Sequence, residues 1–304
     1  MTCALTVTDP LVLGPAQLLG TNVPENDYAE WDSIKVYPIG ERVMRDHAVW
    51  ESAQGNNKGN DPTTAGEWLW MRVGPTNRWA AFEASHTTST SKAGGFWYEF
   101  KPGYAISAIH ITDMIDCMAL RVTLTDPVAG VVWDTGLIAV GRVIPSASWW
   151  QWCFGRRVQV TQKHWYDLPT YPQSNLRIEV IGGNSCSVGC FMAGQTTSFG
   201  DGIKTGLRLG IDDYSRKTRD QWGAEQLRVG AYSQRISLAL LLHNSELDAL
   251  YNFLAQRRTR VLFWSISKRW NSTGVIGFYR NWDILVSYSM YSDVSIDLEG
   301  MQTL

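Results

Sequence analysis

Four carboxylic acids lie among tryptophans in the first third of this 304-residue chain, and paired carboxylates are the groups that hydrolyse glycosidic bonds. Such hydrolysis needs two carboxylates that flank one sugar-binding cleft. The candidates are Glu51, Asp61, Glu67 and Glu83. Asp61 precedes Pro62, where turn geometry alone accounts for an Asp, and no spacing marks two of the four as a pair. We therefore expect no enzyme and keep a glycan hydrolase as the less favoured alternative.

Other catalytic or metal chemistry has no signature in the sequence. It contains no G-x-S-x-G segment, no H-E-x-x-H segment and no glycine-rich nucleotide loop. The five histidines are scattered, and Cys186 and Cys190 form a C-x-x-x-C pair without zinc-site spacing around it. We interpret the cysteines as small buried hydrophobic residues and leave open whether Cys186 and Cys190 are paired. No metal and no cofactor is expected.

The aromatic residues of the N-terminal third suggest binding rather than catalysis. A segment over residues 31–82 holds five of the fifteen tryptophans, separated by Gly, Asn, Asp and Pro rather than by helical spacing. So short a segment cannot bury all these rings in a core of its own, so some must face outward or pack on a neighbour. The five are Trp31, Trp50, Trp68, Trp70 and Trp79.

Short strands and turns must position these rings. We expect a turn at Asp46 and His47 and a long polar loop over residues 55–62. The expected strands lie at residues 34–37, 42–44, 49–52 and 68–73.

The spacing of this segment resembles a small chitin- and cellulose-binding-type module, which occurs in secreted glycosidases and in bacteriophage tail proteins. The matching positions are Tyr37, Gly40, Val43, Val49, Trp50, Glu51, Gly55, Pro62 and Trp68. Glu41 replaces the usual Asp of the family, and His47 stands where Gly is usual. The resemblance implies that sugar rings stack on exposed aromatic side chains. The expected glycan-binding residues are Tyr37, Trp50, Trp68 and Trp70.

Two further segments resemble bacteriophage tail proteins. Residues 74–82, GPTNRWAAF, resemble the stretch that follows such modules there, and we expect Trp79 and Phe82 to anchor the module on the next domain. The C-terminal part is similar to tail structural proteins of long-tailed phages. The matching pieces are DDYSRK at 212–217, YSxR at 232–235, LAxxR at 254–258, GFY at 277–279 and IDLEG at 296–300.

Alternating hydrophobicity predicts a mainly β chain. Residues 120–124 and 176–180 alternate with period two, which is typical of half-buried strands. One helix is expected over residues 245–257, capped by Asn244 or Ser245, with an apolar face at Leu247, Leu250, Tyr251 and Leu254. The predicted division is an arm (1–30), the Trp-rich β module (31–84), a jelly-roll-like β-sandwich (85–203) and an α+β domain with one helix (204–304).

Two other groups are candidate interface residues. We interpret residues 149–152 as a strand. Its side chains alternate between two faces, so not all of Trp149, Trp150 and Trp152 can belong to the core. Tyr214 and Arg216 belong to a mixed-charge run that is either a solvated loop or a contact between subunits.

Composition limits the partners. Only 18% of residues are charged, the net charge is −2 and no basic block occurs, so nucleic acid is not expected. The sequence contains no apolar run of about 18 residues, so we expect no membrane span. The N-terminus lacks the basic region of a signal peptide, so we expect synthesis in a host cytoplasm.

The resemblances imply a structural component of a phage tail tip or baseplate, located in the virion. Its expected partners are other tail proteins, copies of itself and host cell-surface glycan. An assembly or adaptor protein with no ligand is the alternative.

Overall fold

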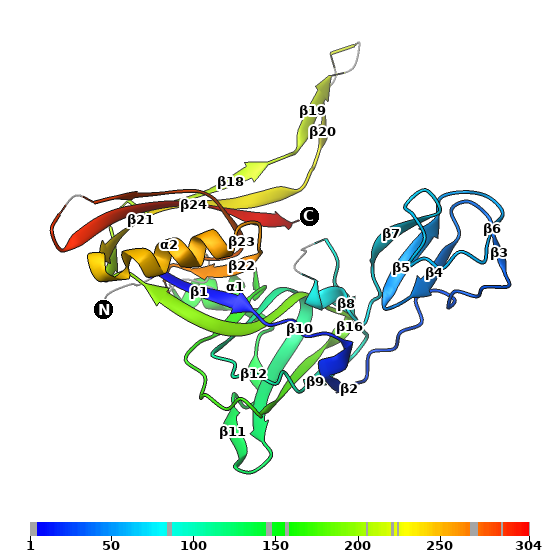
Figure 1. Cartoon of the computed structure of the whole chain (residues 1–304), viewed down its shortest axis with the longest axis horizontal. Coiled ribbons are helices and arrows are strands. Elements are labelled where there is room, and N and C mark those ends of the chain that lie inside the picture. Colours follow the sequence, from blue (N-terminus) through cyan, green and yellow to red (C-terminus); the bar gives the residue numbers. More distant parts are fainter. Residues whose placement is uncertain are drawn as a thin grey trace.

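The computed structural model describes residues 5–83, 87–143, 148–155, 158–204, 206–219, 222–223, 225–267, 273–286 and 288–303. The protein is mainly β, with 54% strand and 9% helix, which confirms the predicted class. Figure 1 shows a body built from sheet, a small module set to one side of it, and a two-stranded ribbon that projects from the body.

One large antiparallel sheet forms the body. Its path runs β11-β10-β16-β1-β22-β23-β24-β21-β17, and further strands pair with β10, β16, β9 and β21. Its strands are β1 (Leu5–Pro10), β2 (Leu18–Thr21), β8 (Thr90–Ser91), β9 (Gly95–Phe100), β10 (Ala108–Asp126), β11 (Gly130–Asp134), β12 (Ile138–Ala139), β15 (Lys163–Trp165), β16 (Asn175–Phe199), β17 (Gly202–Ile203), β18 (Arg208–Asp213), β21 (Tyr232–His243), β22 (Leu262–Ser265), β23 (Gly274–Leu285) and β24 (Tyr291–Thr303).

The sheet is continuous across the predicted boundary at residue 203. β16 pairs with β10 at one end of the body, and its last residues pair with β1. β1 in turn pairs with β22, so the N-terminal segment is a strand inside the sheet rather than an arm laid over it. Leu5 and Val7 are buried there among C-terminal side chains.

β10 runs from Ala108 to Asp126 and extends well beyond the alternating residues 120–124. Asp113 and Asp116 adopt left-handed backbone angles (φ 55° and 53°), and the pairing with β16 shifts register on both sides of Cys117. Such bulges bend a strand without ending it, so Asp113 and Asp116 lie within one long strand.

The two largest hydrophobic cores among the described residues lie in the body. One lies against β9, β10 and β16 and contains Phe96, Tyr98 and Phe100. The other packs the predicted helix, α2 (Leu247–Gln256), on β21 and β24. The shorter helical elements are η1 (Pro15–Gln17), η2 (Ala80–Phe82), α1 (Trp149–Phe154) and η3 (Asn244–Glu246). Of the described helices, none combines the length and the apolar composition that crossing a membrane requires.

The details of α2 differ from the prediction. The helix buries Leu250, Phe253 and Leu254, whereas Tyr251 is 53% exposed and packs edge to face on Trp282. The short helix η3 precedes it, and there the His243 side chain accepts a hydrogen bond from Ser245 N. The expected cap at Asn244 or Ser245 was therefore wrong, because the chain enters the helix through this extra turn.

The small module contains two short sheets, β3 with β6 and β4-β5-β7. Its core is Tyr37, Val43, Leu69 and Trp70. Its strands are β3 (Val36–Tyr37), β4 (Arg42–Arg45), β5 (Ala48–Ser52), β6 (Asn57–Lys58) and β7 (Trp70–Pro75).

Two further pairs of short strands complete the fold: β13 (Arg142–Val143) with β14 (Val158–Gln159), and β19 (Arg216–Arg219) with β20 (Glu225–Arg228). The second pair is the projecting ribbon of Figure 1. Its residues and those of β18 include the mixed-charge run, so most of that run is strand and not the solvated loop considered from sequence.

Candidate functional site

The four predicted glycan-binding aromatic residues do not share one surface. Tyr37 and Trp70 are each 1% exposed, and their rings pack edge to face at 5.2 Å in the module core. Trp70 Nε1 donates to Asn60 O at 2.9 Å. The prediction that Tyr37 and Trp70 stack on a ligand was wrong, because so small a module needs its largest rings to form a core at all.

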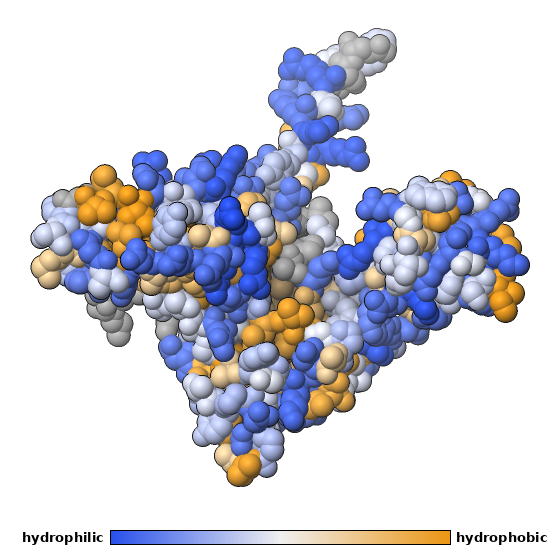
Figure 2. All heavy atoms as spheres, viewed as in Figure 1, coloured by the Kyte–Doolittle hydropathy of each residue, from blue (hydrophilic) through white to orange (hydrophobic). Residues whose placement is uncertain are grey.

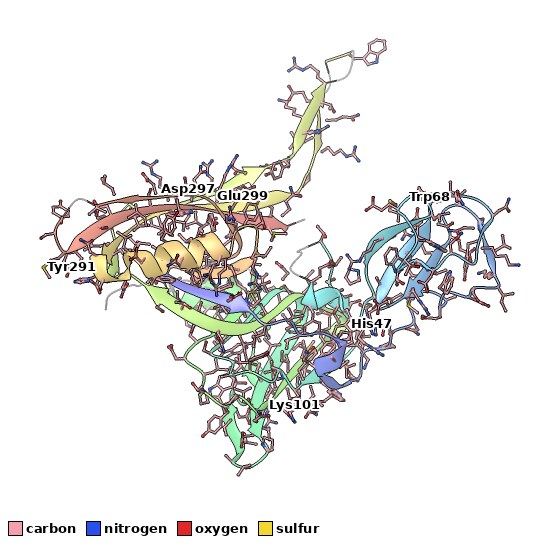
Figure 3. The ribbon with its side chains drawn as sticks, viewed as in Figure 1. His47, Trp68, Lys101, Tyr291, Asp297 and Glu299 are labelled. Atoms are coloured by element: carbon pink, nitrogen blue, oxygen red, sulfur yellow. The ribbon has the colours of Figure 1, made fainter. Side chains whose placement is uncertain are left out.

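Trp68 and Trp50 lie at different ends of the module. Trp68 is 69% exposed on the turn before β7, and Figure 3 places it far from His47, which faces the body. Trp50 is half-buried on β5, and its Nε1 donates to Arg45 O at 3.0 Å. Because this N–H is already bonded, Trp50 can offer a ligand mainly the face of its ring.

A cleft of about 440 Å³ lies where the module meets the body, within the range typical of ligand sites. Trp50, Trp79 and Phe82 supply aromatic surface. The polar lining is Asp46, His47, Arg72 and Glu83, and the remaining lining is Leu13, Pro15, Ala48 and Pro75.

Local structure explains how the module side chains reach this cleft. Asp46 and His47 form the turn between β4 and β5, both with left-handed backbone angles (φ 52° and 60°) that suit a tight hairpin. Trp50 pairs directly with Arg72 of β7, so the two side chains lie on the same face of the sheet. Arg72 Nη1 then meets Glu83 Oε1 at 3.1 Å.

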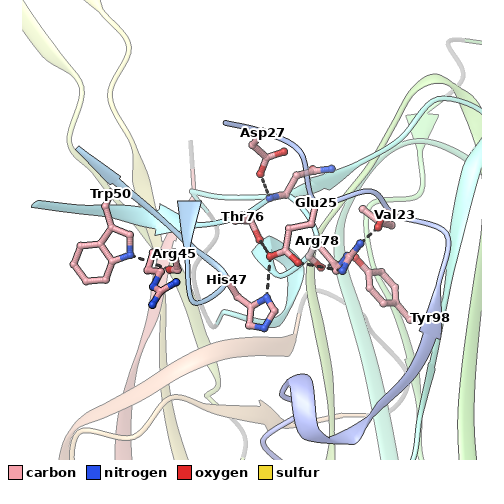
Figure 4. A network of polar contacts seen from close by, with 10 residues as sticks. Val23, Glu25, Asp27, Arg45, His47, Trp50, Thr76, Arg78 and Tyr98 are labelled. Atoms are coloured by element: carbon pink, nitrogen blue, oxygen red, sulfur yellow. Dashed lines mark hydrogen bonds and ion pairs between the residues drawn. The ribbon is translucent and has the colours of Figure 1, made fainter. Parts of the chain in front are cut away.

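A buried carboxylate fixes the module at this position (Figure 4). Glu25 Oε1 accepts a hydrogen bond from Thr76 Oγ1 at 2.7 Å and lies 2.9 Å from His47 Nδ1. Its Oε2 lies 3.1 Å from Arg78 Nη1, and Arg78 Nε donates to Val23 O at 2.9 Å. The Glu25 side chain is 15% exposed, so one carboxylate ties the incoming chain to the hairpin turn and to the segment after β7.

Trp79 and Phe82 continue this joint into the body. Trp79 packs against the His47 ring at 5.4 Å and against Phe100 of β9 at 6.4 Å. Phe82 lies 4.9 Å from both Tyr98 and Phe100. Trp79 therefore bridges the module and the body while it lines the cleft.

Replacing Glu25 with Gln is expected to lower the free energy of unfolding by about 2 kcal/mol, because hydrogen bonds to a charged group are worth about 1.5–3 kcal/mol. Three partners would lose the charge that they contact. Urea denaturation of both proteins measures the difference. Glu30→Gln, at an exposed position of the same segment, is the control, and an equal loss in both variants would contradict the role of Glu25.

The four carboxylates considered for hydrolysis are dispersed. Glu51 pairs with Arg42 at 2.8 Å, and Asp61 pairs with Arg45 at 3.0 Å. Hydrogen bonds from Thr63 lower the pKa of Asp61, and Arg45 adds to this shift. Glu67 is exposed beside Trp68, and of the four only Glu83 lines the cleft.

The predicted interface residues lie on two separate surfaces. Trp149, Trp150 and Trp152 belong to α1 and are 73%, 66% and 62% exposed, so the predicted strand and its core side were wrong. Ser148 Oγ accepts a hydrogen bond from Gln151 N at 3.3 Å and caps this helix. Tyr214, which is 46% exposed, and the exposed Arg216 lie at the base of the ribbon.

Three cysteines are buried as interpreted, namely Cys117, Cys186 and Cys190, whereas Cys153 is exposed on α1. The Sγ atoms of Cys117 and Cys186 lie 3.7 Å apart, and all four cysteines are free thiols. Burial raises the pKa of Cys190 to about 12. Cys3 lies outside the described residues.

Sequence reasoning missed Asp46, His47 and Arg72 as lining residues of the cleft. The turn at Asp46 and His47 was predicted, but the register that sets Arg72 beside Trp50 was not. Within the described part of the chain, no cluster of three or more His, Cys, Asp or Glu side chains could hold a metal ion.

Comparison with known proteins adds no relative: no protein-family description matches this chain, and no curated protein resembles it closely enough to be matched.

Proposed function

We propose that this chain is a structural component of a bacteriophage tail tip or baseplate that binds host-surface glycan in the cleft beside Trp50. The observation that carries the glycan site is a cleft of about 440 Å³ that combines aromatic surface with Asp46, Arg72 and Glu83. The segments over residues 74–82 and 212–217 support the tail setting by their resemblance to tail proteins.

The chemistry of the cleft suits an uncharged sugar. The apolar face of a pyranose ring stacks on Trp50, while the carboxylates of Asp46 and Glu83 accept hydrogen bonds from hydroxyl groups and Arg72 donates them. One aromatic contact contributes about 0.5–1.5 kcal/mol, so a single site binds weakly. Several copies in one particle raise the avidity, which is why self-assembly and glycan binding fit together.

Self-assembly and contacts with other tail proteins form the second part of the proposal. The exposed aromatic residues of α1 and the projecting ribbon support it, because large exposed apolar groups on a folded surface commonly mark contacts with other proteins. The chain would be made in the host cytoplasm and act in the virion.

A glycan array probed with the full chain tests the binding site. Trp50→Ala is expected to lower affinity about tenfold, since it removes the stacking surface. Asp46→Asn is expected to weaken binding as well, and Asn tolerates the left-handed backbone angle at this position. Trp68→Ala, at the far end of the module, is the matched control and should bind as the parent does.

The outcomes separate the alternatives. Binding that survives Trp50→Ala and Asp46→Asn but is lost in Trp68→Ala would move the site to the tip of the module. No binding to any cell-surface sugar would favour an adaptor protein without a ligand. Release of reducing ends from host envelope material would favour a hydrolase.

A further inference from the structure

β18 is an edge strand whose outer side is open. Among the described residues it pairs with β21 alone, from Arg208 opposite Ser237 to Asp213 opposite Tyr232. Leu209 and Ile211 are 51% and 62% exposed. An edge of this kind presents backbone N–H and C=O groups to any strand that can align with it.

The residues of β18 provide little of the usual protection against pairing. Edges are commonly blocked by Pro or by charged side chains, especially Lys. Arg208–Asp213 contains no Pro and no Lys, and its charged residues lie toward its ends, so Leu209, Gly210 and Ile211 between them carry no charge. No atom lies within 4 Å of the position that a Cβ at Gly210 would take, so the centre of the strand is sterically open.

We propose that β18 pairs antiparallel with β18 of a second copy of this chain, about a two-fold axis at Gly210. In that register Arg208 lies opposite Asp212 of the second copy, and Leu209 lies opposite Ile211 of the second copy. Directly opposed residues share a face of the sheet, so the two ion pairs lie on one face and the two apolar pairs on the other. The strand is thus complementary to itself in both charge and hydrophobicity.

Asp212 can take part in this pairing without losing its present contact. Its Oδ1 lies 3.5 Å from Arg235 Nη1, in an ion pair that is partly exposed. A carboxylate accepts several hydrogen bonds, so the second oxygen of Asp212 is available to a guanidinium of the second copy.

The projecting ribbon favours the same occupant. Figure 2 shows the ribbon mostly in hydrophilic colours, and a two-stranded ribbon by itself is only marginally stable in water. β18 leads directly into it through Asp213 and Tyr214. Antiparallel pairing carries the ribbon of each copy past the start of β18 in the other copy, where it meets protein instead of solvent.

This inference rests on the self-assembly in the proposed function, and it is tested on the full chain. Sedimentation should show a concentration-dependent dimer, and Arg208→Asp should weaken it roughly tenfold by setting like charges opposite each other at two positions. The double variant Arg208→Asp with Asp212→Arg should restore it, because the swapped charges again meet opposite ones. Lys101→Asp, at an exposed position outside β18, controls for net charge.

A cross-link tests the axis itself. In a background with Cys3→Ser and Cys153→Ser, Gly210→Cys should form a disulfide-linked dimer under mild oxidation, since opposed residues of neighbouring strands lie close enough for one. Val128→Cys, on a 95% exposed side chain elsewhere, should not. An assembly that keeps its size in Arg208→Asp and gives no Gly210→Cys cross-link overturns the β18 interface but leaves self-assembly through another surface. A chain that stays monomeric at all concentrations overturns both.

Discussion

Replacing Trp79 with Ala is expected to lower the free energy of unfolding by about 3–5 kcal/mol, the usual effect of removing a buried Trp side chain. Trp79 is 7% exposed and packs against His47, Phe82 and Phe100, with ring centroids 5.4–6.4 Å apart. The cavity would open at the joint, so the module should lose its fixed position as well as its stability.

Two measurements check this result. Urea denaturation gives the loss of free energy, and hydrogen exchange of the amides in β5 and β9 shows whether both sides of the joint loosen. Trp68→Ala removes an equally large but 69% exposed ring from the same segment and should cost less than about 1 kcal/mol. Similar losses in the two variants would mean that Trp79 does not hold the joint.

Acidification is expected to destabilise the body through two buried histidines. His110 is 0% exposed, its ring stacks on Phe263 with centroids 3.7 Å apart, and its Nε2 lies 2.8 Å from Thr8 Oγ1. His164 Nδ1 lies 3.3 Å from His110 Nδ1. Burial lowers the pKa of His164 to about 4, and burial, with the nearby His164, also lowers the pKa of His110 well below its usual value.

The sign of the effect follows from where each state binds protons. Well above the unfolded pKa of about 6.5 both histidines are neutral in the folded and the unfolded chain, so they add no pH dependence there. Below that pH the histidines of the unfolded chain bind protons, whereas those of the folded chain stay neutral until the pH reaches their lower pKa. The free energy of unfolding therefore falls as the pH falls. Between pH 7 and pH 5 His164, with a folded pKa of about 4, should cost about 2 kcal/mol, and the lowered pKa of His110 adds to this loss.

Urea denaturation at pH 7 and at pH 5 measures this loss. His164→Gln removes one titrating group and should reduce the loss by about 2 kcal/mol, and His243→Gln, at the last residue of β21 and outside the contact between His110 and His164, is the matched control. Equal pH dependence in the parent and in His164→Gln would show that other groups are responsible.

The His110 contact and the Trp79 joint each hold separate parts of the molecule together. Thr8 of β1, His110 of β10 and Phe263 of β22 bring the N-terminal strand, the middle of the chain and its C-terminal part into one contact. The Trp79 joint does the same for the module and β9. Trp79→Ala and acidification should therefore each change how the parts are held together before any one part unfolds.

Some features could be predicted from the sequence because they depend on neighbours along the chain. Alternation of apolar and polar residues indicated strands around residues 120–124 and 176–180, and the spacing of Leu250 and Leu254 indicated α2. The turn at Asp46 and His47 follows from residues that tolerate left-handed backbone angles. Ser148, with Gln151 three residues later, is a capping pattern that would have indicated α1.

The tertiary structure decided which aromatic rings are available to a partner. Tyr37, Trp50, Trp68 and Trp70 have similar chemistry, yet two form the module core, one lines the cleft and one stands at the tip. Burial of a ring depends on strand register and on what packs over it, and both are set by residues far away in the sequence. The amino-acid pattern was enough to predict a mainly β chain with too many tryptophans for one small core. Which of these rings are exposed depends on the pairing of β5 with β7 and on the packing of Trp79 against Phe100 of β9.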